Sequence, residues 1–566
     1  MPLLRLLSKW CSCLLLITPL FLSLVAWSQT GLPAKADANT TALPELRFRS
    51  RATLIQVPVL VTEKNGAHVS GLGSTDFHIF ENGVEQKVSS FEEIQVSKEV
   101  VPLPPNTPGM YTNQQPDAPE VLTLIAVDMA NTPMPDQVYA RAQLVHYLAK
   151  HIPPNQRIAL VSISTSGLGI IHDVDSDPQA LIRALQRADA GIPANQAAPL
   201  AGNSARLSSQ SDFYNSRSLT AASVDARVEA FMQAVDASTA QFDSNRAIET
   251  TLRAFQAIAW SLSGVPGRKS LIWITDGMPI VRYSADAAMP GYLEALYQRA
   301  IHSLNDAQVA LYPMSAAGLR PQRPIPTNTA NPSKSSSAMN SRGLLADSVR
   351  ASMEMLADQT GGRMTYNTND LDRAFGSVAE DSGSYYLLSY YLAAGDGKPG
   401  WRSLKVALDR HGVEVRSRSG FFVTQGMSDP VSQRKEDLEF ALVSPFNCTG
   451  VPVSVRLPAV NPGSASKTIP FALHLSPTSF TIDPDGNRFD LEFAAIVFKG
   501  GHNVAHTGQS FLGKLTDASL PKFKAKGLNY EDAFSNLSPG EYQVRFVVRD
   551  NLSGRVGSVS APLVVN

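Results

Sequence analysis

Cysteine is scarce in this sequence of 566 residues, and its scarcity excludes two kinds of site. Three cysteines occur, and Cys11 and Cys13 lie in an N-terminal segment that we expect to be removed. Cys448 would then be the single cysteine of the mature chain. An internal disulfide is therefore excluded, and so is a zinc site built on paired cysteines.

An excess of charge of either sign is also absent. The 49 Lys and Arg residues balance 50 Asp and Glu residues, and charged residues make up 17% of the chain. No strong electrostatic field is available to attract nucleic acid, so we do not expect a nucleic-acid-binding protein. The length suggests about three or four domains of roughly 150 residues each.

Long hydrophobic runs are absent as well, and the apolar run at 11–26 is characteristic of an export signal. It follows the basic residues Arg5 and Lys9 and ends in Ala26-Trp27-Ser28, which fits signal cleavage before Gln29. An uncleaved anchor is the alternative, but about 16 residues fall short of the roughly 20 needed to span a bilayer. We therefore expect residues 1–28 to be a signal peptide. The mature protein would have no transmembrane span and would lie in the periplasm, at the cell surface or outside a bacterial cell.

The next segments predict a tether and a small β unit. Residues 29–48 are rich in Ala, Thr and Pro without apolar periodicity, which is typical of a flexible tether. Residues 49–98 contain strand patterns at 54–61, 77–80 and 84–91, separated by turns that include Asn-Gly pairs. We expect an N-terminal antiparallel β unit.

Strand and helix patterns alternate over residues 118–382. Strands are predicted at 121–127, 157–164, 269–275 and 308–313, and helices at 137–150, 178–187, 220–262, 288–305 and 344–359. The first strand is apolar nearly throughout, as in a parallel sheet covered on both faces. Insertions without periodicity interrupt the pattern at about 190–217 and 319–341. This alternation predicts a doubly wound α/β domain.

Strand patterns dominate again after this domain. Residues 383–424 predict a three-stranded β meander, and residues 435–566, with a hairpin at 542–548 and 558–565, predict an immunoglobulin-like β-sandwich. The β regions at 49–98 and 383–424 are each too small to bury a face alone, so we expect them to pack together with the α/β domain inserted between them. The predicted fold class is multidomain α/β plus all-β, with a doubly wound, Rossmann-like domain flanked by β-sandwich domains.

Two acidic residues are predicted at the carboxyl ends of strands, where open α/β sheets bind ligands. Asp128 ends the strand at 121–127, and Asp276 directly follows the strand at 269–275. Thr132 lies close to the first of them in the sequence. If the two strands are neighbours, these oxygen atoms suit a hard cation such as Mg²⁺.

These residues carry a resemblance to a known family. The segments 128–132 (DMANT) and 274–277 (ITDG) resemble a von Willebrand factor A (VWA) domain, whose metal-dependent adhesion site reads D-x-S-x-S, then a distant Thr, then D-G. Together with 76–86, 131–137, 266–270, 360–362 and 417–421, they resemble the VWA-related family of exported acidobacterial proteins over residues 50–424. The resemblance implies adhesion or protein–protein interaction, in which a bound cation accepts a carboxylate from an unknown protein partner.

The resemblance implies a metal site at four positions of this chain. Asp128, Thr132 and Asp276 match the first Asp, the second hydroxyl and the late Asp of the pattern, and Thr250 is our choice for the middle Thr. The positions Thr239 and Thr251 are alternatives for it. The implied ion is Mg²⁺, with Ca²⁺ or Mn²⁺ as alternatives.

The pattern is incomplete at one position. Ala130 replaces the first Ser, and its methyl group cannot coordinate a cation. One oxygen ligand is therefore missing unless Asn131 or water supplies it.

Two other interpretations stay open. Asp128 and Asp276 would cap loops through hydrogen bonds to backbone amides, as Asp often does, and the chain would then be a metal-independent envelope scaffold or assembly protein. We do not expect an enzyme, because no H-E-x-x-H or G-x-S-x-G motif and no positioned base is present. A hydrolase using Asp128, Asp276 and a metal ranks third.

Overall fold

The structure is a computed structural model that describes residues 54–96, 109–114, 121–150, 156–175, 177–189, 222–280, 289–318, 332–368, 371–392, 399–423, 431–457, 468–483 and 487–565. Side chains are described within these ranges except at 175, 189, 222–240, 332–345 and 371–372. The predicted signal peptide (1–28), tether (29–48) and insertion at about 190–217 lie outside the described residues. The chain divides into two units between Arg51 and Ala52, and all described residues belong to the second.

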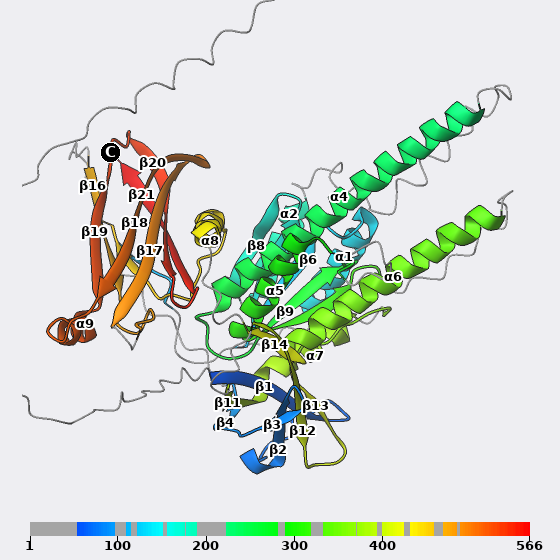
Figure 1. The fold of residues 1–566 in the computed structure, drawn as a ribbon, viewed down its shortest axis with the longest axis horizontal. Helices are drawn as coiled ribbons and strands as arrows, with labels where there is room; N and C mark the ends of the chain where they lie inside the picture. The colour runs from blue at the N-terminus through cyan, green and yellow to red at the C-terminus, as the bar shows by residue number, and fades with distance from the viewer. Residues whose placement is uncertain are drawn as a thin grey trace, which may run out of the picture. The chain divides into compact units, whose positions relative to one another are not determined.

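A five-stranded, mostly parallel sheet forms the core of the central domain (Figure 1). Its strand order is β10-β9-β6-β7-β8, and only β8 runs antiparallel to its neighbour. The strands are β6 (Leu122–Asp128), β7 (Arg157–Ser164), β8 (Gly167–Asp175), β9 (Lys269–Thr275) and β10 (Val309–Ser315). Every residue of β6, β9 and β10 is buried, as the apolar runs in the sequence predict for a sheet covered on both faces.

Helices cover both faces of this sheet. They are α1 (Met134–Lys150), α2 (Pro178–Asp189), α4 (Ala222–Leu262), α5 (Gly291–Asp306), α6 (Pro332–Thr360) and α7 (Leu371–Gly383). Side chains of α4, α5 and α6 share one core with Leu124 of β6, whereas those of α1, α2 and α7 share a second core with the next residue, Ile125. Successive side chains of a strand point to opposite faces, so the central strands contribute to both cores.

Three parts of this domain were not predicted from the sequence. Helix α6 begins at Pro332, inside the segment 319–341 that we predicted as an insertion. Its first turn is rich in Ser, which is typical of loops, although Pro is favourable at the first position of a helix. Helix α7 and strand β8 were not predicted either, because their Gly, Ser and Asp residues interrupt any regular pattern.

The two β regions on either side of the α/β domain pair with each other. They contribute β1 (Leu54–Glu63), β2 (Phe77–Glu81), β3 (Val84–Gln86), β4 (Ser90–Gln95), β11 (Ser384–Tyr391), β12 (Gly400–Leu408), β13 (Val413–Arg416), β14 (Gly420–Val423) and the short 3-10 helix Ser74–Asp76. The sheets are β13-β1-β11-β4 and β14-β12-β2-β3, so each sheet mixes strands from both regions. Val57 pairs with Leu388 across β1 and β11. This is the pairing that an inserted α/β domain requires.

The predicted meander at 383–424 is wrong in its connectivity. Strand β11 pairs with β1 and β4, and β12 pairs with β2 and β14, so β11 and β12 lie in different sheets. Consecutive strands usually pair with each other. Here β11 and β12 each pair with a strand about 300 residues away in the chain.

The C-terminal region has two four-stranded sheets that share one apolar core. Its elements are α8 (Val431–Val443), β15 (Ser454–Arg456), β16 (Thr468–Leu475), β17 (Arg488–Lys499), β18 (His502–Lys514), α9 (Leu520–Lys526), β19 (Leu528–Ser535), β20 (Gly540–Asp550) and β21 (Val556–Val565). The predicted hairpin is present as β20 and β21. Strand β5 (Met110–Thr112) precedes the α/β domain in the chain but joins β15 of this region. The immunoglobulin-like classification stays a prediction.

Candidate functional site

Asp128 and Asp276 meet at the carboxyl edge of the parallel sheet. Strands β6 and β9 are direct neighbours, with Val127 opposite Ile274. Asp128 is the last residue of β6, and Asp276 directly follows β9. Because parallel neighbours end at the same edge, the two positions lie in the crevice where this class of sheet binds ligands.

The carboxylate of Asp128 is completely buried and saturated with hydrogen bonds. Its Oδ1 atom accepts from the backbone N–H groups of Ala130 and Asn131, both at 3.0 Å. Its Oδ2 atom accepts from Asn131 Nδ2 at 2.9 Å, Trp273 Nε1 at 3.0 Å and Thr275 Oγ1 at 3.0 Å. Asp128 therefore ties the loop after β6 to strand β9 from within the protein.

Burial and hydrogen bonding change the pKa of the Asp128 carboxyl group in opposite directions. Burial raises the pKa of Asp128 above its ordinary value, and the hydrogen bonds from Asn131, Thr275 and Trp273 oppose that rise. These donors take over the role that water has at an exposed carboxylate.

Asn131 joins Asp128 to helix α4. Its Nδ2 atom donates to the Asp128 carboxylate and also to the hydroxyl of Thr251, at 2.8 Å. The opposite orientation of the amide would place Oδ1 against the carboxylate, so the observed orientation is the favourable one. The Oδ1 atom of Asn131 is buried and has no hydrogen-bond partner among the described residues.

Of the two threonines predicted as metal ligands, Thr132 lies in the Asp128 cluster and Thr250 does not. Thr132 is buried in the same loop, and its Oγ1 accepts a hydrogen bond from the backbone N–H of Asp276 at 3.1 Å. Thr250 lies apart from this cluster, because its hydroxyl donates to the carbonyl oxygen of Arg246 one turn back in α4. Thr251, the alternative position, is the threonine that contacts Asn131.

A hollow of about 280 Å³ opens between helix α4 and the turn that precedes β8, and we call it the edge hollow. It is lined by Thr165, Ser166, Gly167 and Leu168 from the start of β8 and the turn before it, by Arg246, Glu249, Thr250, Arg253 and Ala254 from α4, and by Phe440 from α8. The loop after Asp128 is hydrogen-bonded to the end of β7, directly before this turn. The backbone N–H groups of Met129 and Ala130 donate to the carbonyl oxygen of Ile163.

Two arginines give the edge hollow its charge. Arg253 is partly neutralised by Glu249, with Nε and Oε1 3.0 Å apart. Arg246 is exposed and forms an ion pair with no carboxylate of the described residues. The sequence analysis did not single out Arg246, because nothing in its local pattern distinguishes it from other surface arginines.

The residues of the Asp128 cluster do not fit a divalent cation. Such a cation takes about six oxygen ligands, whereas both oxygens of Asp128 already accept hydrogen bonds. The indole N–H of Trp273 cannot become an acceptor, the Asn131 amide presents its nitrogen and not its oxygen to Asp128, and Ala130 adds only a methyl group. Among the residues described, no group of three or more His, Cys, Asp or Glu side chains could hold a metal ion.

Comparisons with known proteins give no family assignment. No protein-family model matches the sequence, and no curated protein matches it. In the part of the chain that the structure describes, no helix combines the length and apolar character needed to cross a membrane.

Two solved structures show a distant likeness. The N-terminal domain of TFIIH p34 is 10% identical, and the match covers 46% of this chain and 97% of that chain with a TM-score of 0.21. The ArnB paralog VWA2 from Sulfolobus acidocaldarius is 8% identical, and the match covers 91% of this chain and 75% of that chain, also with a TM-score of 0.21. At this TM-score neither likeness carries an argument about the present chain.

Proposed function

We propose that this chain is a protein-interaction protein whose VWA-like α/β domain binds a partner at the edge hollow without a divalent cation. The observation that carries the proposal is the position of Asn131 Nδ2, between the carboxylate of Asp128 and the hydroxyl of Thr251. A neutral amide group thus joins the acidic and hydroxyl groups that the metal-site pattern would join through a cation. Of the two possibilities that the sequence leaves open, this geometry supports the metal-independent one.

Arg246 supports a partner with an acidic group. An exposed guanidinium beside Thr165 and Ser166 offers several donors and a full positive charge to a carboxylate. In a metal-dependent adhesion site the cation would supply that charge. We therefore propose that an Asp or Glu side chain of a partner protein enters the edge hollow and pairs with Arg246.

Catalysis is not part of the proposal. A metal-assisted hydrolase would need the Asp128 carboxylate to face a substrate or a water molecule, and this carboxylate is completely buried. Export to the periplasm, cell surface or medium is also proposed from the sequence. N-terminal sequencing of the mature protein tests removal of the export signal, and a chain that begins before Gln29 with the apolar run intact would contradict cleavage.

Calorimetric titration of residues 29–566 with Mg²⁺, Ca²⁺ and Mn²⁺ tests metal independence. We expect no saturable heat with any of the three ions. Saturable binding that is lost in Asp128→Ala would overturn the metal-independent proposal and restore the adhesion site that the sequence resemblance implies.

Partner binding is tested with the immobilised chain and a solubilised envelope fraction of the source cells. A protein retained equally in EDTA and in Mg²⁺, and lost with Arg246→Glu, supports the proposal. Arg187→Glu is the matched control, because Arg187 is an exposed arginine on α2, which packs on the other face of the sheet. Retention that requires Mg²⁺ and is unaffected by Arg246→Glu would contradict the proposal.

A further inference from the structure

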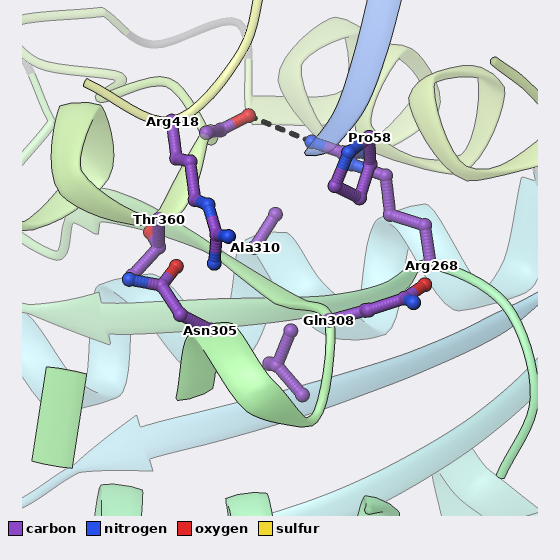
Figure 2. A pocket seen from close by; sticks show the side chains of 9 residues that line it. Pro58, Arg268, Asn305, Gln308, Ala310, Thr360 and Arg418 are labelled. Atoms are coloured by element: carbon purple, nitrogen blue, oxygen red, sulfur yellow. Dashed lines mark hydrogen bonds between the residues drawn. The ribbon is translucent and has the colours of Figure 1, made fainter. Parts of the chain in front are cut away.

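A second site lies at the opposite edge of the parallel sheet, and we call it the joint cavity. It is a cavity of about 10 Å³, which is room for one water-sized species. Its lining comes from β1, the end of α5, the starts of β9 and β10, the end of α6 and the link between β13 and β14 (Figure 2). The residues are Pro58, Arg268, Asn305, Gln308, Val309, Ala310, Thr360, Gly361 and Arg418. The cavity therefore lies where the α/β domain meets the sheets into which it is inserted.

Arg418 places an unsatisfied donor at this cavity. Its side chain is only 7% exposed, and its Nη2 atom donates to the carbonyl oxygen of Gln56 at 2.9 Å. The guanidinium carbon lies 5.4 Å from the centre of the Phe421 ring. The Nε atom is buried and has no hydrogen-bond partner in the part of the chain that the structure describes. Arg418 forms no ion pair with a carboxylate among the described residues.

Arg268 is a second buried guanidinium that is held by carbonyl groups. It is 4% exposed, and it donates from Nη1 to the carbonyl oxygen of Asp381 at 2.9 Å and from Nη2 to that of Gly361 at 2.7 Å. The carboxylate of Asp381 is engaged elsewhere, by Arg416 and by the hydroxyl of Tyr312. In Figure 2 the side chains of Arg268 and Arg418 lie on different sides of the cavity.

The guanidinium groups of Arg268 and Arg418 are positively charged and are almost completely shielded from water. Buried charges are ordinarily paired, because removing an ion from water is costly. Burial lowers the pKa of Arg418, while the nearby Asp306 raises it. Asp306 is 65% exposed and pairs with His302, so it compensates the buried charge only weakly. Arginine nevertheless remains protonated at neutral pH.

We propose that the joint cavity binds one small monovalent anion of the halide type, with chloride as the physiological ion. The anion accepts a hydrogen bond from Arg418 Nε and lies in the combined field of Arg418 and Arg268. In the structure Gln308 Nε2 donates to Gln56 Oε1, and the buried Oε1 atom of Gln308 has no hydrogen-bond partner among the described residues. Exchanging the oxygen and nitrogen positions of both amides together keeps their mutual hydrogen bond and makes Gln308 a further donor. The bound ion links β1 and the Arg418 segment to the amino ends of β9 and β10.

Thermal unfolding of residues 29–566 in sodium chloride and in sodium gluconate at equal ionic strength tests the proposal. Gluconate is too large for the cavity, so only chloride can bind the folded state and stabilise it. We expect the Tm to rise by about 1 °C for each tenfold increase in chloride above the dissociation constant. Arg418→Met should abolish this dependence. Arg363→Met is the matched control, because Arg363 is exposed on the surface and donates to Ser377.

A bromide-soaked crystal gives a readout that does not depend on any variant. An anomalous peak within hydrogen-bonding distance of Arg418 Nε confirms the site, even if Arg418→Met fails to fold. Equal Tm values in chloride and gluconate would overturn the proposal. A water molecule in the cavity, with no bromide signal there, would overturn it as well.

Discussion

The side-chain amide of Asn131 donates a hydrogen bond to the buried carboxylate of Asp128 at 2.9 Å, within the loop that follows the central strand β6. This contact gives Asp128 a structural role, since the same amide nitrogen also holds the hydroxyl of Thr251 on α4. The aspartate that sequence comparison would assign to a metal thus holds together a strand, a loop and a helix. Whether Asp128 has a structural or a metal-binding role depends on the side chains around it, above all on Asn131.

A double substitution tests this dependence on neighbours. In Ala130→Ser/Asn131→Ala the bridging amide is removed and the missing hydroxyl is restored, so Asp128 Oδ2 keeps two of its three donors and the Thr251 hydroxyl loses the donor from Asn131. We expect the double variant to bind Mg²⁺ with a dissociation constant of about 1 mM or tighter, in the range of weak oxygen-ligand sites. Calorimetry of the wild type and the double variant measures the difference.

Adding Asp128→Asn to the double variant is the control, and it should abolish the gained binding. If the wild-type chain binds Mg²⁺ as tightly as the double variant, Asn131 does not replace the cation.

Lys269 predicts a specific pH dependence of stability. It lies at the start of β9 with 1% of its side chain exposed, and its Nζ donates to the carbonyl oxygen of Val265 at 2.7 Å. Burial lowers its pKa from 10.5 to about 7. The folded state therefore releases this proton near pH 7, whereas the unfolded chain keeps it until about pH 10.5. Because the unfolded state binds more protons in this window, the free energy of unfolding should rise from pH 7 towards pH 10.5.

Lys269→Met isolates this contribution. We expect the variant to be about 1–3 kcal/mol more stable than the wild type at pH 7, because an uncompensated buried amine is removed. The difference in the free energy of unfolding between Lys269→Met and the wild type should be smaller at pH 9 than at pH 7. Urea unfolding at both pH values measures it, and a gap that is constant or widens with pH would show that Lys269 is not the titrating group.

The elements of the α/β domain were predictable to the extent that their patterns are local. Strands β6 and β9 are apolar runs, and the rule that ligands bind at carboxyl ends of parallel strands placed Asp128 and Asp276 together. The small size of the two β regions predicted that they pack together, but the individual partners of β11 and β12 were not predictable, since strand pairing across about 300 residues leaves no local pattern.

The finer geometry of the site was not predictable for a different reason. Neighbouring residues of a helix point about 100° apart, so the choice between Thr250 and Thr251 depends on how α4 is rotated against the sheet. The donors to Asp128 depend in the same way on the directions of the Asn131 and Trp273 side chains. Packing decides these directions.

Gly362 marks a place where only glycine fits. It follows α6, and a Cβ atom there would lie 1.8 Å from the carbonyl oxygen of Leu311 in β10. Gly362→Ala should therefore destabilise the α/β domain by roughly 3 kcal/mol or more, because backbone has to move away from backbone. Gly376 in α7 is the matched control, since its Cβ would meet no atom within 4 Å. Gly376→Ala should stabilise the protein by about 0.5–1 kcal/mol. Urea unfolding measures both, and equal effects would contradict the close approach at Gly362.

The insertion of the α/β domain predicts that the surrounding sheets can fold without it. The backbone N–H of Val96 donates to the carbonyl oxygen of Gly383 at 2.9 Å, so the points where the α/β domain enters and leaves these sheets are adjacent. Residues 54–96 joined to 384–423 by a short Gly-Ser linker should therefore form both sheets around their shared core, in which Val57, Phe77 and Leu388 are buried. Dispersed amide signals in a two-dimensional NMR spectrum and cooperative thermal unfolding are the expected results. Residues 54–96 alone are the control, and they should be unfolded because β1 and β2 lose their partners β11 and β12. A linked chain that is as disordered as this control would show that the sheets depend on the α/β domain for their stability.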